Sequence, residues 1–329
     1  MNEIALVATG ETVVRFDAEG GRTRPASGLD EQHPTGIAAD PHTPGRAWCC
    51  TRHGGVFRTD DTGRSWVPSG LEGVALMSLV FSPSRPDLIW AGSEPSAVWR
   101  SDDGGRTWDA TSRLEALPSS SGWAFPPRPE THHVRWIGCH PSDERKLWVA
   151  IEAGALVRSD DGGVTWRDRV PGGPYDTHEL VVTATEEGDV VRSAAGDGYH
   201  ESRDGGDSWV SPREGLEITY LRSVATDPGD PRTVLVSGAT GPRSAYVRGR
   251  SDGRVYRREG GGAWVRVEEG WPSEPSTIAP LLVPGRHGGE FYAADERGVH
   301  RSSDGGRTWK QVWSFSPIPT HLRGLAILF

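Results

Sequence analysis

Side chains that bind metals, bind anions or transfer protons recur at two fixed distances before a set of prolines in this sequence. Eight positions before a proline stand His33, His133 and Tyr220, with Asp176 and His321 at the equivalent places of two units that lack the proline. Six positions before a proline stand Arg135 and Arg222, with His178 and Arg323 equivalent. If the fold brings these side chains together, they form a polar site for a small molecule.

A metal site is one interpretation of these positions. His33, His133, His178 and His321 come from four different units of the chain, and imidazole nitrogens are common ligands of divalent ions. Glu152 or Asp176 would complete or orient such a ligand set. On this interpretation we expect one divalent metal ion as the cofactor.

Anion binding is a second interpretation. The guanidinium groups of Arg135, Arg222 and Arg323 suit a carboxylate or a phosphate, because their paired N–H groups match its oxygens. Glu94 and Asp197, in turns expected at the same end of their units, complete the predicted substrate-binding set. The expected ligand is a small polar or anionic molecule.

Catalysis is predicted for Glu152, Asp176, His178 and Tyr220, whose side chains can all transfer protons. A third interpretation is glycoside hydrolysis by two carboxylates, for which Glu94, Glu152, Asp176 and Asp197 are candidates. The sequence contains no P-loop, dinucleotide fingerprint, G-x-S-x-G elbow or H-E-x-x-H motif.

A short motif, S-x-D-x-G-x-[TS]-W with Thr in place of Ser in one copy, defines the elements that must position these residues. Its five clear copies end at Trp66, Trp108, Trp166, Trp209 and Trp309, and two worn copies end at Trp264 and near Arg24. The hydroxyl and the Asp carboxylate can accept backbone amides of a tight turn, the Gly permits an unusual backbone conformation, and the Trp packs beneath the hairpin. A Ca²⁺ loop would need a distal Glu that is missing, so the motif is predicted to be structural.

With these five copies the chain resembles the BNR/Asp-box repeat proteins, a group that includes sialidases and sortilin-type propellers. The resemblance spans nearly the whole chain and implies a β-propeller. The middle of the chain looks like bacterial members of this group that are labelled glycosyl hydrolase or sialidase. Sialidases use an arginine triad with a Tyr/Glu nucleophile pair, which implies such roles for the three arginines and for Tyr220 with Glu152.

The chain also departs from the families that it resembles. Sialidases have six blades and an N-terminal Arg-Ile-Pro segment, whereas this sequence has seven units and no such segment. The four histidines resemble, in arrangement alone, the axial iron ligands of the carotenoid-cleavage oxygenases.

Each repeat unit is expected to contain four strands, with the motif between the third and the outer strand, so that one unit is one propeller blade. The N-terminus begins at a second strand (4–8) and continues through a third (13–16), while the C-terminus, 322–328, looks like an inner strand. We therefore predict an all-β chain with one seven-bladed propeller domain over 1–329, in which the last strand pairs with residues 3–9 and closes the ring.

Two long insertions indicate which face of the ring carries the site. Residues 111–132 connect an outer strand to the next inner strand, and residues 241–253 connect a second strand to a third. In a four-stranded meander both connections lie on the face opposite the repeated motif. Long loops gathered on one face are typical of a binding face.

Composition and charge exclude several classes of protein. The formal net charge of −9 disfavours general binding to nucleic acid or to anionic membranes, and no apolar run is long enough to span a bilayer. The start, MNEIALVATG, has no secretory features, and the three cysteines (Cys49, Cys50, Cys139) have no metal-site spacing. These features predict a cytoplasmic monomer with reduced core cysteines.

Three functions remain open. The first is an enzyme that processes a small molecule in a His/Arg/carboxylate pocket, with or without a metal ion. The second is a glycoside hydrolase or sialidase-like enzyme acting on an anionic sugar. The third is a non-catalytic binding or assembly scaffold, as in the photosystem-assembly propellers of this repeat type.

Overall fold

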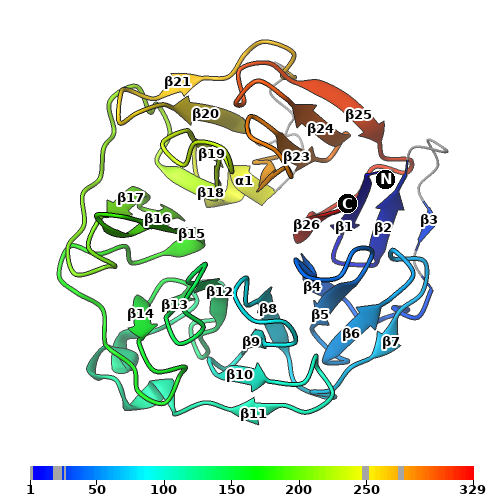
Figure 1. The fold of residues 1–329 in the computed structure, drawn as a ribbon, viewed down its shortest axis with the longest axis vertical. Helices are drawn as coiled ribbons and strands as arrows, with labels where there is room; N and C mark the ends of the chain where they lie inside the picture. Colours follow the sequence, from blue (N-terminus) through cyan, green and yellow to red (C-terminus); the bar gives the residue numbers. More distant parts are fainter. Residues whose placement is uncertain (1–2, 18–23, 26, 247–251, 273–277) are drawn as a thin grey trace.

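Seven small antiparallel sheets stand around a central axis, so the predicted all-β, seven-bladed propeller is confirmed (Figure 1). The structure is a computed structural model that describes residues 3–17, 24–25, 27–246, 252–272 and 278–329. Most of the N-terminal worn motif, over 18–23, and residues 247–251 of the second insertion lie outside the described residues.

In six blades the strands follow one another in chain order from the axis outward, and in the seventh the C-terminal strand is innermost. The blade that contains both ends of the chain is formed by β26 (Gly324–Leu328), β1 (Ile4–Ala8), β2 (Val13–Phe16) and β3 (Arg24–Pro25). The next two blades contain β4 (Pro34–Ala39), β5 (Ala47–Thr51), β6 (Val56–Thr59) and β7 (Val67–Pro68), then β8 (Leu76–Phe81), β9 (Ile89–Ser93), β10 (Val98–Ser101) and β11 (Asp109–Ala110).

The remaining four blades complete the circle. Two of them have three strands each: β12 (Val134–Cys139), β13 (Leu147–Ile151) and β14 (Ala155–Ser159), then β15 (Thr177–Thr185), β16 (Gly188–Ala195) and β17 (Gly198–Ser202). The last two contain β18 (Tyr220–Thr226), β19 (Val234–Ala239), β20 (Arg254–Arg258) and β21 (Val265–Arg266), then β22 (Leu281–Pro284), β23 (Phe291–Asp295), β24 (Gly298–Ser302) and β25 (Lys310–Ser314).

Two blades differ from the predicted four-stranded unit. In the blades of β14 and β17, the outer segment makes a single β-bridge, Arg158 with Arg167 in one and Glu201 with Val210 in the other. The outer edge of a blade faces solvent, so it tolerates this loss without exposing the core.

The ring closes as predicted, because the C-terminal strand completes the first blade. β26 pairs antiparallel with β1 from Ile4 opposite Leu328 to Ala8 opposite Gly324 (Figure 1). Leu325 and Ile327 are buried against the apolar side chains of β1 and of the preceding blade. The closure therefore covers strand edges and joins two blades through one apolar cluster.

The repeated motif forms a self-contained turn, here called the repeat turn. In one copy, the Ser101 hydroxyl accepts the amide of Gly105 at 2.8 Å and donates to Asp103 at 2.9 Å. The Asp103 carboxylate accepts the amides of Arg106 and Thr107, each at 2.9 Å, and the Thr107 hydroxyl at 2.7 Å. The same contacts recur at Asp161, Asp204 and Asp304 with their neighbours.

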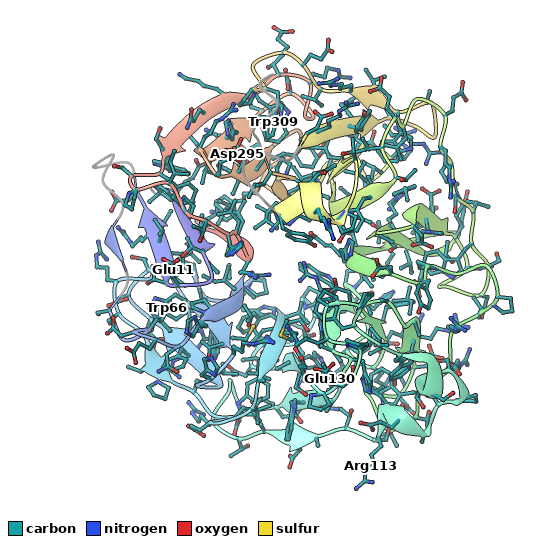
Figure 2. All side chains as sticks on the ribbon, turned by 180° about the vertical axis from the view of Figure 1, so that it is seen from behind. Glu11, Trp66, Arg113, Glu130, Asp295 and Trp309 are labelled. Carbon is teal, nitrogen blue, oxygen red and sulfur yellow. The ribbon has the colours of Figure 1, made fainter. Side chains whose placement is uncertain are left out.

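Tryptophans join the repeat turns to the cores between blades. Trp66 and Trp309 are almost fully buried and lie within their blades, away from the axis (Figure 2). Trp48 and Trp90, on second strands, are fully buried, and each lies beneath an arginine of the neighbouring third strand or turn. These rings account for the bias toward Trp in the sequence.

Helical structure is confined to the two insertions in the described ranges. The first insertion contains two short 3₁₀ helices, η1 (Leu114–Ala116) and η2 (Pro118–Gly122), and the second begins with α1 (Pro242–Tyr246). Within those ranges, no helix has both the length and the apolarity that crossing a bilayer requires.

Candidate functional site

A β-bulge at the same place in five inner strands turns one side chain from each strand toward the axis. The pairing register of β4, β8, β12, β15 and β18 with its neighbour skips one residue. The skipped residues are Thr35, Met77, Arg135, His178 and Arg222, which all line the axial channel. Bulges commonly re-aim a side chain next to a functional site. In these strands the residue six positions before the proline, or its equivalent, is therefore the bulged residue. Arg323, directly before β26, is the equivalent residue of the blade that closes the ring, and it also lines the cavity.

The imidazole of His178 is the centre of the polar cluster at the channel mouth. Its Nδ1 lies 2.5 Å from the Leu221 carbonyl oxygen, to which it donates, so Nε2 faces the opening. Nε2 lies 3.8 Å from Glu152 Oε1, 3.6 Å from Asp176 Oδ2 and 3.3 Å from the Tyr220 hydroxyl. Burial opposes the charge on His178, but neighbouring Tyr246, Asp176 and Glu152 raise its pKa to about 9. The imidazole is therefore a proton donor at neutral pH.

The carboxylates beside His178 are held in place by separate contacts. Glu152 accepts a hydrogen bond from His133 Nε2 at 2.7 Å and lies 3.4 Å from Arg135 Nε. Burial raises the pKa of Glu152, but these two partners and His178 outweigh it and lower the pKa to about 2. Asp176 Oδ1 accepts the amide of Ala153 at 2.9 Å, and Ala153 has a left-handed φ of 50°. The amide that holds Asp176 thus belongs to a residue in a sparsely populated backbone conformation.

Two arginines at the mouth, the buried Arg222 and the exposed Arg323, have no carboxylate partner among the described residues. Arg222 is 2% exposed, and its terminal nitrogens donate to the carbonyls of Ala279 at 2.6 Å and Leu322 at 2.5 Å. Among the described residues, no carboxylate lies within 4 Å of Arg222 or of Arg323, and the Nε of Arg222 has no partner there. Burial lowers the pKa of Arg222 to about 10, a value that still leaves it charged at neutral pH. Buried charge without a counterion is costly, so this cation is suited to a bound anion.

Tyr246 covers the cluster from the second insertion. Its ring lies over the Arg222 guanidinium, 4.9 Å from Cζ, and its ring centroid is 6.4 Å from that of Tyr220. Burial opposes ionisation of this phenol, but the positive charges of His178, Arg135 and Arg222 lower its pKa overall. Tyr246 is therefore more acidic than an ordinary phenol.

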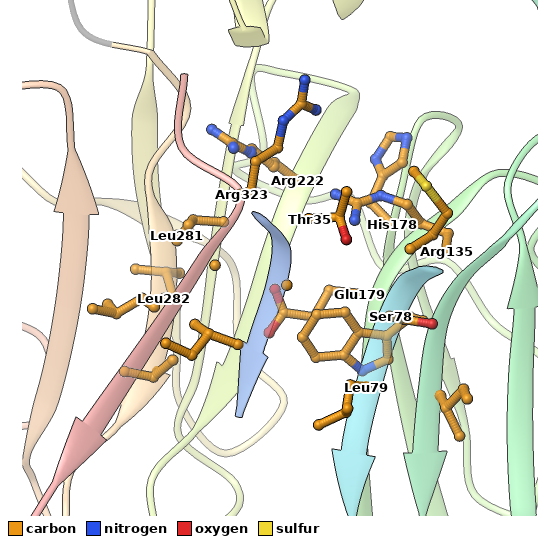
Figure 3. A pocket seen from close by; sticks show the side chains of 18 residues that line it. Thr35, Ser78, Leu79, Arg135, His178, Glu179, Arg222, Leu281, Leu282 and Arg323 are labelled. Carbon is orange, nitrogen blue, oxygen red and sulfur yellow. The ribbon is translucent and has the colours of Figure 1, made fainter. Parts of the chain in front are cut away.

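A small axial cavity lies just inside this mouth. It has a volume of about 60 Å³ and is lined by residues from all seven inner strands or the segments that lead into them. A buried water needs about 10–15 Å³, so the cavity accommodates a small group such as a carboxylate or a tetrahedral anion. Figure 3 shows Arg135, His178, Arg222 and Arg323 toward one end, Glu179 and Leu282 near the middle, and Leu79 toward the other end.

The structure brings some of the predicted site residues together and separates others. Glu152, Asp176, His178, Tyr220, His133, Arg135, Arg222 and Arg323 lie at the channel mouth. Glu94 is instead paired with Arg52 and Arg128, and Asp197 lies 3.3 Å from the buried His200. His33 stacks edge-on against His53, and His321 is exposed beside Arg323.

Donor atoms that could hold a metal ion are grouped more narrowly than the sequence predicts. Within the described residues, one group of three or more donor side chains is found, and it consists of Glu152, Asp176 and His178, with donor atoms within 4.8 Å of one another. Of the four histidines predicted as ligands, this group contains only His178. The hydrogen bond from His178 Nδ1 to a carbonyl is typical of metal-binding histidines, but Nε2 would first have to lose its proton.

Four residues near the mouth were missed by sequence reasoning. Tyr246 lies in an insertion that was expected on this face, but no chemistry was assigned to it. Arg128 lies in the other insertion and donates to Glu94 at 2.7 and 3.0 Å, and Arg52 lies beside that carboxylate. Glu179 directly follows His178, which stands at the place equivalent to six positions before the proline. Each bulge also displaces the next side chain, so this spacing in the sequence could have identified Glu179.

Comparison with known proteins supports the fold and no finer assignment. No protein-family model matches the sequence, and no curated protein is significantly similar to it. Among solved structures, a GH74 enzyme from Niastella koreensis is similar with a TM-score of 0.70 at 15% identity, over 94% of this chain and 52% of that chain. An ancestral GH74 enzyme is similar with a TM-score of 0.66 at 15% identity, over 86% of this chain and 39% of that one.

A shorter neighbour is similar over most of its own length. YCF48, solved bound to D1 peptide, has a TM-score of 0.59 at 18% identity, over 87% of this chain and 84% of that chain. The chain thus spans about half or less of each GH74 enzyme but most of YCF48. At such low identity these likenesses show a shared propeller fold.

Proposed function

We propose that this chain is an enzyme that binds a small anionic molecule at the channel mouth and transfers a proton to or from it. The observation that carries the proposal is Arg222, a buried guanidinium with no carboxylate within 4 Å among the described residues. Arg323, which is exposed to solvent, adds a second cation at the same opening. A bound carboxylate, phosphate or sulfate would supply the missing negative charge.

Acid–base groups lie beside this anion site. Ionised Glu152 and protonated His178 have opposite charges at neutral pH, and Tyr220 contacts His178 at 3.3 Å. A group that accepts a proton and a group that donates one, next to a charged binding site, support acid–base chemistry on the bound molecule. Asp176, held by the Ala153 amide, would orient the imidazole.

A glycoside hydrolase acting on an anionic sugar is the second candidate. Oxygens of Glu152 and Asp176 lie within 4.8 Å of each other, a separation near that of the two carboxylates in retaining enzymes, and GH74 enzymes are among the structural neighbours. The low pKa of Glu152 suits a nucleophile or a stabilising charge, which leaves His178 as the acid. The Tyr/Glu arrangement of sialidases would use Tyr220 or Tyr246 instead.

A divalent ion remains a separate proposal for the same cluster. Glu152, Asp176 and His178 would hold it, and the ion would supply a Lewis acid at the mouth. Binding would require His178 to lose its proton, so affinity for a metal should rise with pH.

A non-catalytic scaffold is the third candidate, and YCF48 bound to D1 peptide shows that a propeller of this size can bind a peptide. A scaffold would not need a buried arginine that, in the described ranges, has no carboxylate partner and lies beside acid–base groups. The small axial cavity also favours a small ligand over a peptide.

Calorimetric titration with inorganic sulfate and with glucuronate tests the proposal. The wild type should bind at least one of them, and Arg323→Gln should weaken binding by about tenfold or more, because a hydrogen bond to a charged group contributes about 1.5–3 kcal/mol. Arg106→Gln is the matched control, since Arg106 is exposed on a repeat turn. The proposal is wrong if the wild type binds neither anion, or if Arg323→Gln binds as tightly as the wild type.

A turnover assay distinguishes the proposed enzyme from a protein that only binds the anion. An aryl glucuronide, whose cleavage releases a coloured phenol, tests the anionic-sugar candidate directly. Glu152→Gln should abolish cleavage while sulfate binding is retained. Sulfate binding together with no turnover of any aryl ester or glycoside of an anionic acid would favour a binding protein.

A further inference from the structure

Neighbouring blades are packed together near the repeat turns by a side chain that recurs around the ring. At four interfaces a second-strand residue lies against a glycine of the next blade's repeat turn: Leu6 against Gly63, Trp48 against Gly105, Trp148 against Gly206 and Leu235 against Gly306. These contacts are close, because a Cβ on Gly306 would lie 2.7 Å from Leu235 and one on Gly105 would lie 2.9 Å from Trp48. An apolar side chain therefore fills each of these interfaces.

At the interface between the blade of β15–β17 and the blade of β18–β21, a charged residue stands in this place (Figure 1). The second-strand residue there is Arg192, which pairs with Glu201 at the register where three other blades pair a tryptophan with an arginine. Its guanidinium turns back toward its own blade, where Nη1 donates to the Thr183 hydroxyl at 3.2 Å. On the facing turn, a Cβ on Gly260 would have no described atom within 4 Å beyond its chain neighbours.

The missing apolar side chain leaves a hollow, here called the interblade cavity. Its volume is about 400 Å³, against about 60 Å³ for the axial cavity, and small-molecule sites commonly have about 300–1,000 Å³. Its walls include Val190, Arg192 and Glu201 of one blade and Val234, Arg258 and Gly261 of the other. Thr185 at the end of β15 also lines it, whereas His178 is near the start of that strand, so the interblade cavity lies away from the channel mouth.

The buried charges of the interblade cavity are unequal in number. Arg192 is 6% exposed, Arg258 8% and Glu201 4%, so two buried cations share this buried carboxylate. Arg258 Nη1 lies 3.4 Å and Arg192 Nε lies 3.6 Å from Glu201 Oε2, and the Nε of Arg192 has no hydrogen-bond partner within the described ranges. Burial raises the pKa of Glu201, but the Tyr199 hydrogen bond and the neighbouring arginines outweigh it and lower the pKa. Glu201 is therefore ionised at neutral pH, and one buried positive charge remains in excess.

The exposed rim of the cavity does not cancel this excess. Two arginines and two glutamates line the rim, and their charges offset one another: Arg203, Arg232, Glu186 and Glu187. Arg203 also pairs with Glu201 at 3.0 Å, so that carboxylate already has three cationic partners. Because a buried charge without a counterion is costly, the excess suits a singly charged anion.

We propose that the interblade cavity binds an aromatic carboxylic acid. The ring of the ligand would lie against Gly260 and Gly261, in the place that a second-strand tryptophan occupies in other blades. Its carboxylate would take the excess charge of Arg192 and Arg258, since guanidinium N–H groups match carboxylate oxygens and guanidinium groups attract aromatic faces. A singly charged acid balances the cavity, whereas a doubly charged oxyanion would make it negative. This site goes beyond the proposed function, because the two cavities share no lining residue among the described ones.

Titration calorimetry with indole-3-acetate tests this inference. The wild type should bind it about tenfold or more tightly than it binds acetate, which lacks the ring, or indole, which lacks the charge. Arg192→Trp should abolish the binding, because a ring of the protein then fills the cavity as in other blades; its melting temperature checks that it is folded. Arg323→Gln is the control and should bind indole-3-acetate as the wild type does, since Arg323 lies at the channel mouth.

A second variant keeps the cavity open. Arg192→Gln removes one buried charge, while Arg203 and Arg258 still pair with Glu201, so this variant should fold even where Arg192→Trp does not. It should weaken binding of indole-3-acetate by about tenfold and leave the affinity for indole unchanged.

Three results would overturn the interblade site. They are a wild type that does not bind indole-3-acetate, an Arg192→Gln variant that binds it as tightly as the wild type, and loss of its binding in Arg323→Gln, which would place the probe at the channel mouth. None of them removes the anion site at the mouth, which sulfate binding tests separately.

Discussion

The repeat turns and the bulged inner strands are both repeated around the ring, but they use repetition in opposite ways. In the clear repeat turns the side chains recur with the backbone: Asp103, Asp161, Asp204 and Asp304 accept the same kinds of amide and hydroxyl groups. At the bulges the backbone recurs and the side chains differ, from Thr35 and Met77 to Arg135, His178 and Arg222.

This difference separates the structural and functional parts of the molecule. A turn whose polar atoms bond to each other needs no ligand, and each copy stabilises its own blade. A ring of side chains aimed at one axis by the same distortion can combine several chemistries at one point. Arg222 is buried and has no carboxylate partner among the described residues, whereas in the repeat turns each of these carboxylates is supplied with donors.

The largest expected effect comes from opening the ring, because the repeat turns and the bulged inner strands both depend on a closed ring. Deletion of residues 322–329 removes β26, exposes the edge of β1 and uncovers the apolar cluster that Leu325 and Ile327 help to form. We expect the truncated chain to lose its cooperative thermal unfolding transition, as followed by circular dichroism. An unchanged melting temperature would show that the ring does not depend on this closure.

A smaller effect is expected from the tryptophans of the repeat turns. Trp309 is 5% exposed, so Trp309→Ala should lower the free energy of unfolding by about 3–5 kcal/mol in urea titrations, while sulfate affinity stays at the wild-type value. Trp166 is only half-buried, so Trp166→Ala should cost less. Loss of sulfate binding at normal stability in either variant would give the repeat turns a functional role and erase the contrast drawn above.

The fold was largely predictable from the sequence because its signals are local and repeated. The motif ending in Trp marks each hairpin, and the strands at 4–8 and 13–16 have the predicted bounds in β1 and β2. The missing outer strands in the blades of β14 and β17 were not predictable, because a two-residue edge pairing leaves no periodic pattern to read.

The site was predictable in part, for a physical reason. The proline register identified Arg135, His178, Arg222 and Arg323, since a fixed distance from the end of a strand gives a fixed height on the axis. The partners of these side chains depend on turns and insertions whose conformations no repeat determines. Glu94 therefore pairs with Arg128 of the first insertion, and Tyr246 of the second covers Arg222.

The position of a bound anion tests the central claim most directly. Crystals grown without sulfate or phosphate and soaked in selenate would locate the ion by the anomalous scattering of selenium. The account predicts one strong site at the channel mouth, within hydrogen-bonding distance of Arg222 and Arg323, which disappears in Arg323→Gln crystals. Selenate bound at the repeat turns, with the mouth unoccupied at the same concentration, would contradict it.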